Sequence, residues 1–159
     1  MVLGPGSESG GGVHALNLAK IAKAYIRQAG DRLDDAKRAL ERGNYPYTLR
    51  LSQECVELCL KAALKTIGVE YPKIHDVSDV LLEYRDRFPA WFAYEVEFLA
   101  NASRSLAAKR EVSFYGGEEA LLSPDDLVDR KDAEQAIEQA SKTYELITRL
   151  LQLPKHNVM

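Results

Sequence analysis

Apolar residues recur every three or four positions along most of the chain, which is the spacing of one face of an α-helix. Glycine, asparagine and proline interrupt this pattern at a few points, where we expect turns. No segment alternates apolar and polar residues with an enrichment of β-branched side chains, so we expect no sheet. The predicted helices are Leu16–Gly43, about Tyr47–Ile67, about Val77–Arg87, one that starts at Pro89 and gives way at Glu111 to a long turn, and one that starts at Ser123 and ends at Pro154.

Five helices of this kind predict an all-α fold, an up-and-down helical bundle in a single domain. In the last helix the apolar positions follow one another by four and then three residues, which is the spacing of nearly antiparallel bundle helices. Residues 13–153 form the predicted domain. Residues 1–12, which are rich in glycine and serine, are expected to be a flexible tail, and residues 154–159 a C-terminal tail.

The composition fits a globular protein and argues against two classes of function. The 159 residues include 24 acidic and 21 basic side chains, a net charge of −3, which argues against coating of nucleic acid through bulk charge. No run approaches about 18 apolar residues, so we expect no membrane span. Residues 1–12 contain neither a basic nor an apolar stretch, so we expect no secretion signal there.

The sequence predicts neither a metal site nor a cofactor site. Cys55 and Cys59 lie one helical turn apart and no histidine is grouped with them, so we expect two buried, reduced cysteines rather than a zinc site. The phosphate-binding loop, the dinucleotide fingerprint, the zinc-protease motif and the serine-hydrolase motif are all absent.

Arg110 is the most informative candidate site residue. The apolar stripe of the fourth predicted helix continues in steps of three and four and ends on this arginine, just before a glycine turn; its members are Phe92, Val96, Leu99, Ser103 and Leu106. A guanidinium in phase with a buried face can bind phosphate oxygens at a cleft or a subunit seam. The alternative is an arginine that caps the helix or extends its charged end to water.

Three further residues near Arg110 are candidates for ligand binding. Arg104 carries a second guanidinium, Glu111 is the polar residue after Arg110, and Tyr115 could stack on a base or present its hydroxyl. The alternatives are a solvated face for Arg104 and aromatic packing for Tyr115. His75, which precedes a helix start, is expected to be a structural turn residue.

The chain resembles the HEPN domain family. The resemblance rests on the segment from Ser52 to Lys65 (SQECVELCLKAALK), followed by Gly68 and by the run Ile74-His75-Asp76-Val77. Gly43-Asn44-Tyr45 before the second helix and the segment from Arg110 to Gly116 also fit. The resemblance covers about Ala36 to Leu151.

This resemblance implies a helical bundle that forms a homodimer in the cytoplasm of a prokaryote or archaeon. Many HEPN proteins are encoded with a minimal nucleotidyltransferase as toxin and antitoxin, and many cleave RNA without a metal. In the RNases a histidine follows the motif arginine and its polar neighbour. Here Tyr115 takes the first place where that histidine could fall, and tyrosine, with a pKa of about 10, is a poor general base. Whether the protein is an enzyme therefore stays open.

Three hypotheses follow from these residues. The first is a dimeric HEPN protein that binds nucleotide or RNA at Arg110 and Tyr115 and is the toxin-like partner of a nucleotidyltransferase. In some such pairs the partner nucleotidylates the motif tyrosine, for which Tyr115 is the candidate. The second is a metal-independent RNase. The third is a non-catalytic dimeric interaction module. Its fourth helix would be the dimer face, with Trp91, Phe92 and Tyr94 buried between subunits and an ion pair occupying Arg110.

Overall fold

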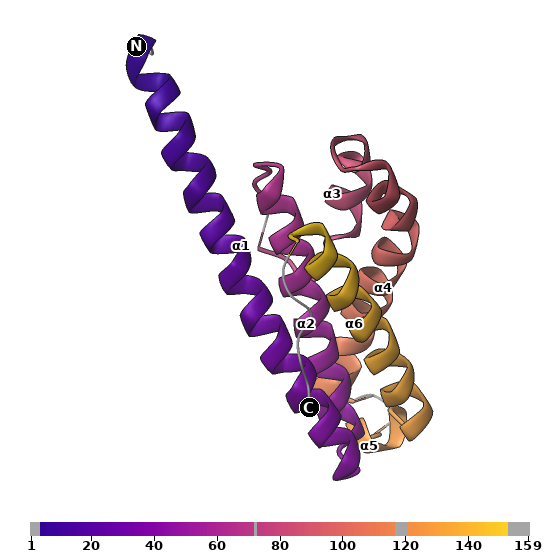
Figure 1. Cartoon of the computed structure of the whole chain (residues 1–159). Coiled ribbons are helices and arrows are strands. Elements are labelled where there is room, and N and C mark those ends of the chain that lie inside the picture. The colour runs from indigo at the N-terminus through magenta and orange to yellow at the C-terminus, as the bar shows by residue number, and fades with distance from the viewer. Residues whose placement is uncertain (1–3, 72, 117–120, 153–159) are drawn as a thin grey trace.

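The fold is all-α, as the hydrophobic pattern predicts. The computed structural model describes residues 4–71, 73–116 and 121–152, and no strand occurs among them. Six α-helices and one 3₁₀ turn follow in chain order: α1 (Gly4–Glu41), α2 (Tyr45–Thr66), α3 (Ser78–Glu83), η1 (Arg85–Arg87), α4 (Ala90–Tyr115), α5 (Pro124–Leu127) and α6 (Arg130–Leu150). Figure 1 shows the four long helices α1, α2, α4 and α6 as the rods of the bundle.

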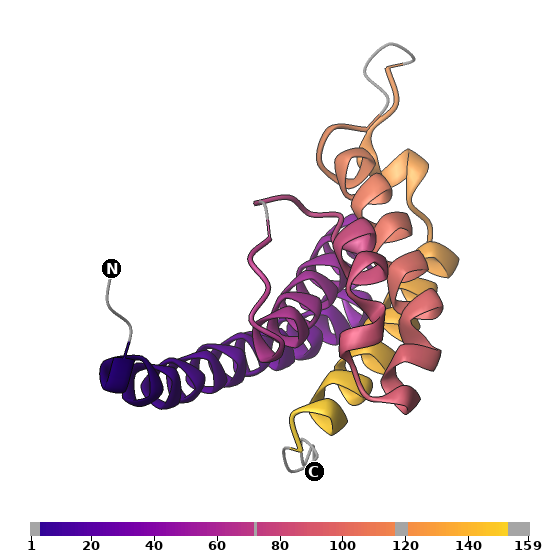
Figure 2. The same cartoon turned by 90° about the horizontal axis from the view of Figure 1, so that it is seen from above.

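Helix α2 is the central rod, because it packs against α1, α4 and α6. Helix α1 packs on α2 and α6, and its N-terminal half extends beyond the bundle (Figures 1 and 2). The segment between α2 and α3 leaves the end of α2 and crosses to α4, on which α3 packs. Residues from α1, the α2–α3 segment and α4 can therefore meet on α2.

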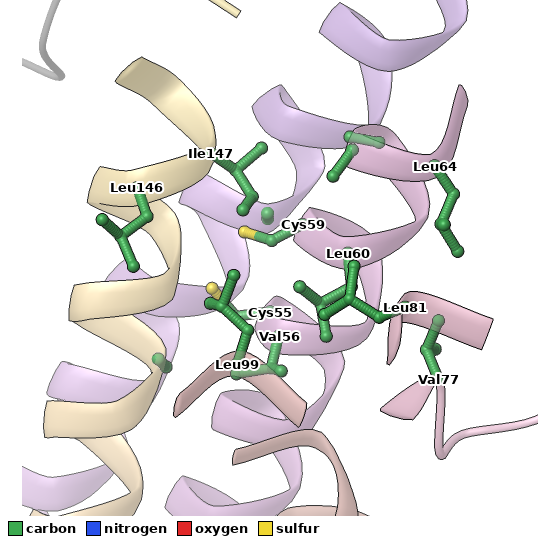
Figure 3. Close-up of a cluster of buried hydrophobic side chains, with 14 of the residues drawn as sticks. Cys55, Val56, Cys59, Leu60, Leu64, Val77, Leu81, Leu99, Leu146 and Ile147 are labelled. Carbon is green, nitrogen blue, oxygen red and sulfur yellow. The ribbon is translucent and has the colours of Figure 1, made fainter. Parts of the chain in front are cut away.

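The core lies where α2 faces the other long helices. Cys55, Val56, Cys59 and Leu60 are completely or almost completely buried, and Figure 3 shows them with Leu99 of α4 and with Leu146 and Ile147 of α6. Both cysteines are free and buried, as predicted. Burial, and next the neighbouring Cys55, raise the pKa of the Cys59 thiol, which makes it a packing residue rather than a nucleophile.

The close approach of α1 and α6 accounts for Gly30, a glycine in the interior of α1. A Cβ atom added to Gly30 would lie 3.0 Å from the hydroxyl oxygen of Tyr144 on α6. The missing side chain lets the tyrosine ring pack directly against the backbone of α1. The glycine therefore lies inside the helix and does not end it.

One element boundary near the candidate site, the C-terminal end of α4, differs from the prediction. Helix α4 continues to Tyr115, so residues 111–115, expected in a long turn, are helical. The helix ends at Gly116, whose φ of 69° suits glycine and whose N–H donates to the carbonyl of Val112 at 2.9 Å. A Cβ there would lie 2.3 Å from the carbonyl oxygen of Leu122, because the chain returns against this point.

The remaining differences concern helix ends. Helix α1 begins at Gly4, so residues 4–12, expected in a flexible tail, continue α1; residues 1–3 and the tail 154–159 lie outside the described part. The third predicted helix divides into α3 and η1, and the fifth into α5 and α6. The last division arises because two capping boxes follow each other, one at Ser123 and Asp126 and one at Asp129 and Asp132.

Candidate functional site

Helix α4 carries the apolar stripe that led to Arg110, and all five of its predicted members are buried; they are Phe92, Val96, Leu99, Ser103 and Leu106. Residues spaced by three and four share one face of a helix, so the next position on this face is Arg110. Its side chain retains 17% of its exposure, which places the guanidinium at the edge of the bundle interior rather than in open solvent.

Arg110 binds two adjacent side chains of α2. Its Nη1 donates to Oε1 of Gln53 at 2.8 Å and to Oε2 of Glu54 at 3.2 Å. The other carboxylate oxygen of Glu54 accepts a hydrogen bond from Nε of Arg32 on α1 at 2.8 Å. One carboxylate thus lies between two guanidiniums, and the three residues join α1, α2 and α4 through charge-assisted hydrogen bonds.

Gln53 and Glu57 connect Arg110 to the segment between α2 and α3. They lie one turn apart on α2, and Nε2 of Gln53 donates to Oε1 of Glu57 at 2.9 Å. The same oxygen lies 2.6 Å from Nδ1 of His75, and Nζ of Lys61 donates to the other oxygen at 2.7 Å. The contacts form a continuous chain from the guanidinium of Arg110 to the imidazole of His75.

The carboxylate of Glu57 stays ionised although its side chain is only 17% exposed. Burial raises the pKa of this group, but hydrogen bonds from Lys61, Gln53 and His75 together outweigh burial and hold the pKa below its usual value of 4.5. Glu57 therefore acts as a fixed negative charge that accepts three hydrogen bonds. Glu57 and Lys61 lie one turn apart on α2, and both side chains of this ion pair are largely shielded from solvent.

The residues after His75 are fixed to α4. The hydroxyl of Ser103 accepts the backbone N–H of Val77 at 2.8 Å, and the same hydroxyl donates to Asp76 at 3.4 Å. Asp76, which the sequence favours as the N-cap of the short helix, accepts the N–H of Ser78 at 2.9 Å, but the N-cap position is taken by Val77. Ser103 lies two turns before Arg110 on the same face of α4, so His75 and Arg110 are held by one pair of helices.

The described side chains of the predicted binding residues lie in different surroundings. Arg104 and Glu111 are exposed, and Arg110 is turned inward. Tyr115 is the last residue of α4, and its side chain lies outside the described part of the structure. Arg104, Glu111 and Tyr115 therefore stay predictions as ligand-binding residues.

Sequence reasoning missed Gln53 and Glu54 as partners of Arg110, and it missed Arg32, which shares Glu54 with Arg110. The sequence indicated these residues only in part. Gln53 falls in the apolar phase of α2 and is 2% exposed, and a glutamine in such a position needs hydrogen-bond partners. The partner itself lies 57 residues away along the chain, and spacing alone cannot identify a contact of that kind.

The described part of the chain offers neither a metal site nor a membrane-spanning helix. Among its residues no group of three or more histidine, cysteine, aspartate or glutamate side chains could hold a metal ion. None of its helices combines the length and the apolar character that crossing a bilayer requires.

Comparison with known proteins identifies the family of this chain. A profile of the HEPN domain matches residues 22–150, a range that includes Arg110, His75 and the residues that connect them. The curated protein "Putative toxin MJ1304" of Methanocaldococcus jannaschii is 28% identical over 138 residues, a stretch that covers 83% of this chain and 89% of the relative. No solved structure gives a significant match. The match over most of the chain shows that this protein belongs to the HEPN domain family.

Proposed function

We propose that this protein is a toxin-like HEPN protein that binds nucleotide or RNA at the C-terminal part of α4. Membership of the family and the similarity to "Putative toxin MJ1304" support the toxin-like role. We further propose that it works with a minimal nucleotidyltransferase as its antitoxin partner, that it forms a homodimer and that it is cytoplasmic, as the family resemblance implies.

The observation that carries the binding proposal is that Arg110 and Arg32 share the single carboxylate of Glu54. Each oxygen of this carboxylate faces one guanidinium, so two cationic side chains from different helices are held next to each other. A phosphate oxygen offers Arg110 the same charge-assisted hydrogen bond that Glu54 now accepts, while Arg32 can retain the carboxylate. Lys109 and the exposed Arg104 add positive charge on the same stretch of α4.

The direct test is titration of the full chain with ATP, GTP and a short single-stranded RNA at low ionic strength. The Arg110→Ala variant should bind the ligand that the parent prefers about 10- to 100-fold more weakly, which corresponds to about 1.5–3 kcal/mol for a hydrogen bond to a charged group. Glu54 keeps its bond to Arg32 in this variant, so the bundle should stay folded.

A matched control is Arg149→Ala, which also removes one guanidinium. Arg149 lies 3.9 Å above the ring of Trp91, at the opposite end of α4 from Arg110. We expect its affinity to stay within about twofold of the parent, since a contact about 28 Å away along a helix of 1.5 Å rise is screened. The proposal fails if none of the three ligands binds the parent below millimolar concentration, or if both variants bind equally well.

The proposed partnership has its own test at Tyr115. Incubation of the chain with a minimal nucleotidyltransferase and ATP should add nucleotidyl groups to the parent, and the Tyr115→Phe variant should stay unmodified. Intact-mass spectrometry measures both. A modified Tyr115→Phe chain would place the acceptor elsewhere, and an unmodified parent would contradict the modification of Tyr115.

The homodimer is proposed through α4. Tyr94 is 85% exposed on this helix, between the half-buried rings of Trp91 and Phe98. Light scattering should give twice the monomer mass at micromolar concentration and a monomer for Tyr94→Lys. A monomeric parent would contradict this part of the proposal.

Two alternatives each have one observation in their favour. The ion pair between Arg110 and Glu54 is the contact that the interaction-module hypothesis predicts, and an absence of ligand binding would favour that hypothesis. A metal-independent RNase is favoured by the imidazole of His75, which the hydrogen-bonded chain connects to Arg110.

A further inference from the structure

The bundle has an uncovered apolar notch at the end from which α1 projects (Figure 1). A cavity of about 210 Å³ lies where α1 passes the ends of α2 and α6, and the residues that line this notch are Leu18, Ala19, Lys23, Thr66 and Leu151. Leu18 and Leu151 are only half-buried, and the hydroxyl of Thr66 already donates to the carbonyl of Ala63 at 2.6 Å. Since a cavity of about 150 Å³ can hold a benzene ring, the notch has room for one large apolar side chain.

A basic stripe runs along α1 beside this notch. Lys20, Lys23 and Arg27 are spaced by three and four residues, so they share one face of the helix, and all three are exposed. None of them forms an ion pair with another residue in the described part of the chain. Positive charge beside an apolar cavity suits a ligand that combines a large apolar side chain with carboxylates, because a phosphate alone would leave the cavity unfilled.

The chain itself exposes such a combination around α5. Leu121 is 91% exposed, and Leu122 and Leu127 are 40% and 37% exposed. The carboxylates of Asp125 and Asp126, between these leucines in the sequence, are exposed as well. We call residues 121–129 the acidic segment, because the only charged side chains in it are three aspartates.

Packing within one molecule does not account for Leu121. Its φ is 57°, a left-handed conformation that is unfavourable for a residue with a Cβ atom. Its side chain buries almost no surface in return. Entry of this side chain into an apolar cavity of another molecule would remove it from water, which is the gain that the isolated chain lacks.

We propose that the acidic segment of one molecule docks into the notch of a second copy of this chain, with Leu121 in the cavity and Asp125 beside Lys23. Figures 1 and 2 show α5 and the projecting part of α1 far apart on the bundle, so the two surfaces of one molecule do not meet. The contact is therefore head-to-tail, and each pair of molecules keeps one free surface of each kind, to which further copies can add. A contact of this small size is weak and forms at high protein concentration.

This inference goes beyond the proposed function and does not depend on it. Gln53, which binds Arg110, lies about 20 Å from Thr66 along α2 at a rise of about 1.5 Å per residue. The notch and the proposed binding site are therefore separate surfaces.

The experiment is sedimentation equilibrium of the full chain at low ionic strength, from low micromolar to near-millimolar concentration. The mean mass of the parent should rise with concentration beyond that of a dimer, because a head-to-tail contact does not close on itself. Leu121→Asn should weaken this association about 10-fold or more, the value of one buried leucine side chain, and asparagine tolerates the left-handed backbone. Lys37→Glu, an exposed position on α1 outside the stripe, is the control and should stay within about twofold of the parent.

An exchange of charges tests the pairing of the two surfaces. Lys23→Glu and Asp125→Lys each place like charges on both surfaces of one chain, so each variant alone should associate about 10-fold more weakly than the parent. An equimolar mixture of the two variants offers opposite charges in both orientations and should regain the parental mass. A variant that had merely lost its fold would not be rescued by mixing.

A synthetic peptide of the acidic segment adds an independent measurement. In excess it should occupy the notch and lower the mass of the parent, while the same peptide with Leu121→Ser should have little effect.

Three results would overturn the proposal. The first is a parental mass that stops at a monomer or a dimer at every concentration, and the second is a mixture of Lys23→Glu and Asp125→Lys that associates no better than either variant alone. The third is weaker binding of short RNA by Lys23→Glu without any change in mass, which would make the basic stripe a nucleic-acid surface. Loss of RNA binding by Arg110→Ala would leave all three measurements of assembly unaffected, so this proposal and the proposed function can fail separately.

Discussion

One face of α2 is completely buried and another is largely buried, and different forces hold the two. One face carries Cys55, Val56, Cys59 and Leu60, which pack against apolar side chains of the other long helices (Figure 3). The other carries Gln53, Glu57 and Lys61 at four-residue spacing, and the segment before α3 covers it with His75 and with the ring of Tyr71, 5.0 Å from Nζ of Lys61. A buried polar row of this kind is retained only when its partners are fixed.

This difference indicates that the apolar face of α2 mainly stabilises the fold, while the polar face holds the groups that can perform chemistry. Apolar burial is proportional to area and tolerates exchange between side chains of similar volume. The polar row depends on individual donors and acceptors, and each of its groups has a specific partner. Substitutions on the first face should therefore affect folding alone, and substitutions on the second should affect folding less and function more.

The largest effect is expected on the apolar face. Leu60 is completely buried, and Leu60→Ala should lower the free energy of unfolding by about 2–5 kcal/mol, the cost of lost burial plus a cavity. Urea denaturation measures the change. Ligand affinity of the folded fraction should be unaltered. A large loss of affinity in Leu60→Ala would contradict the assignment of folding to the apolar face and of function to the polar face.

A smaller effect on stability is expected for Gln53→Leu. This substitution removes the amide between Arg110 and Glu57 and leaves both with one partner fewer, which costs about 1–3 kcal/mol. A double-mutant cycle with Arg110→Met should show a coupling free energy of about 0.5–3 kcal/mol. Additive effects within about 0.3 kcal/mol would mean that the hydrogen bond contributes nothing.

The contrast between the faces also explains what the sequence could predict. Helical periodicity identified α2 and the α4 stripe that ends on Arg110, because burial imposes a repeat that a sequence displays. The partners of Arg110 could not be found in this way, since Gln53 and Glu54 meet it only after α2 and α4 pack. His75 was expected to be a turn residue, and the covering of Glu57 by the segment before α3 is what changes its environment.

Local chemistry limited the prediction at the ends of helices. The C-terminal part of α4 was expected to be a turn because two glycines follow it, but the first glycine ends the helix only after Tyr115. The capping residues at Asp129 were not recognised, and so α5 and α6 were expected as one helix. These errors of a few residues leave the phase of Arg110 unchanged.

The next prediction concerns the stability of the protein at acid pH. Since the pKa of Glu57 in the folded chain lies below its usual 4.5, the carboxylate contributes stability above the usual value, and this contribution is lost as the pH falls through the lowered pKa. The free energy of unfolding should therefore fall on the acid side of pH 4.5 more steeply for the parent than for Glu57→Gln. Urea denaturation between pH 3 and pH 7 measures both curves, and parallel curves would contradict the role of the buried carboxylate.

The smallest effect is expected for a charge pair outside both faces. Asp35 and Arg38 lie one turn apart on α1 with Nη1 to Oδ1 at 2.6 Å, but their side chains are 48% and 64% exposed. Water screens such a pair, so Arg38→Ala should change the free energy of unfolding by less than about 0.5 kcal/mol. Arg32→Ala, on the same helix, removes a partner of the half-buried Glu54 and should cost more. Equal losses of unfolding free energy would mean that the two guanidiniums that contact Glu54 are no better protected from solvent than an ordinary surface pair. The protected polar contacts of α2 would then end at Gln53 and exclude Glu54.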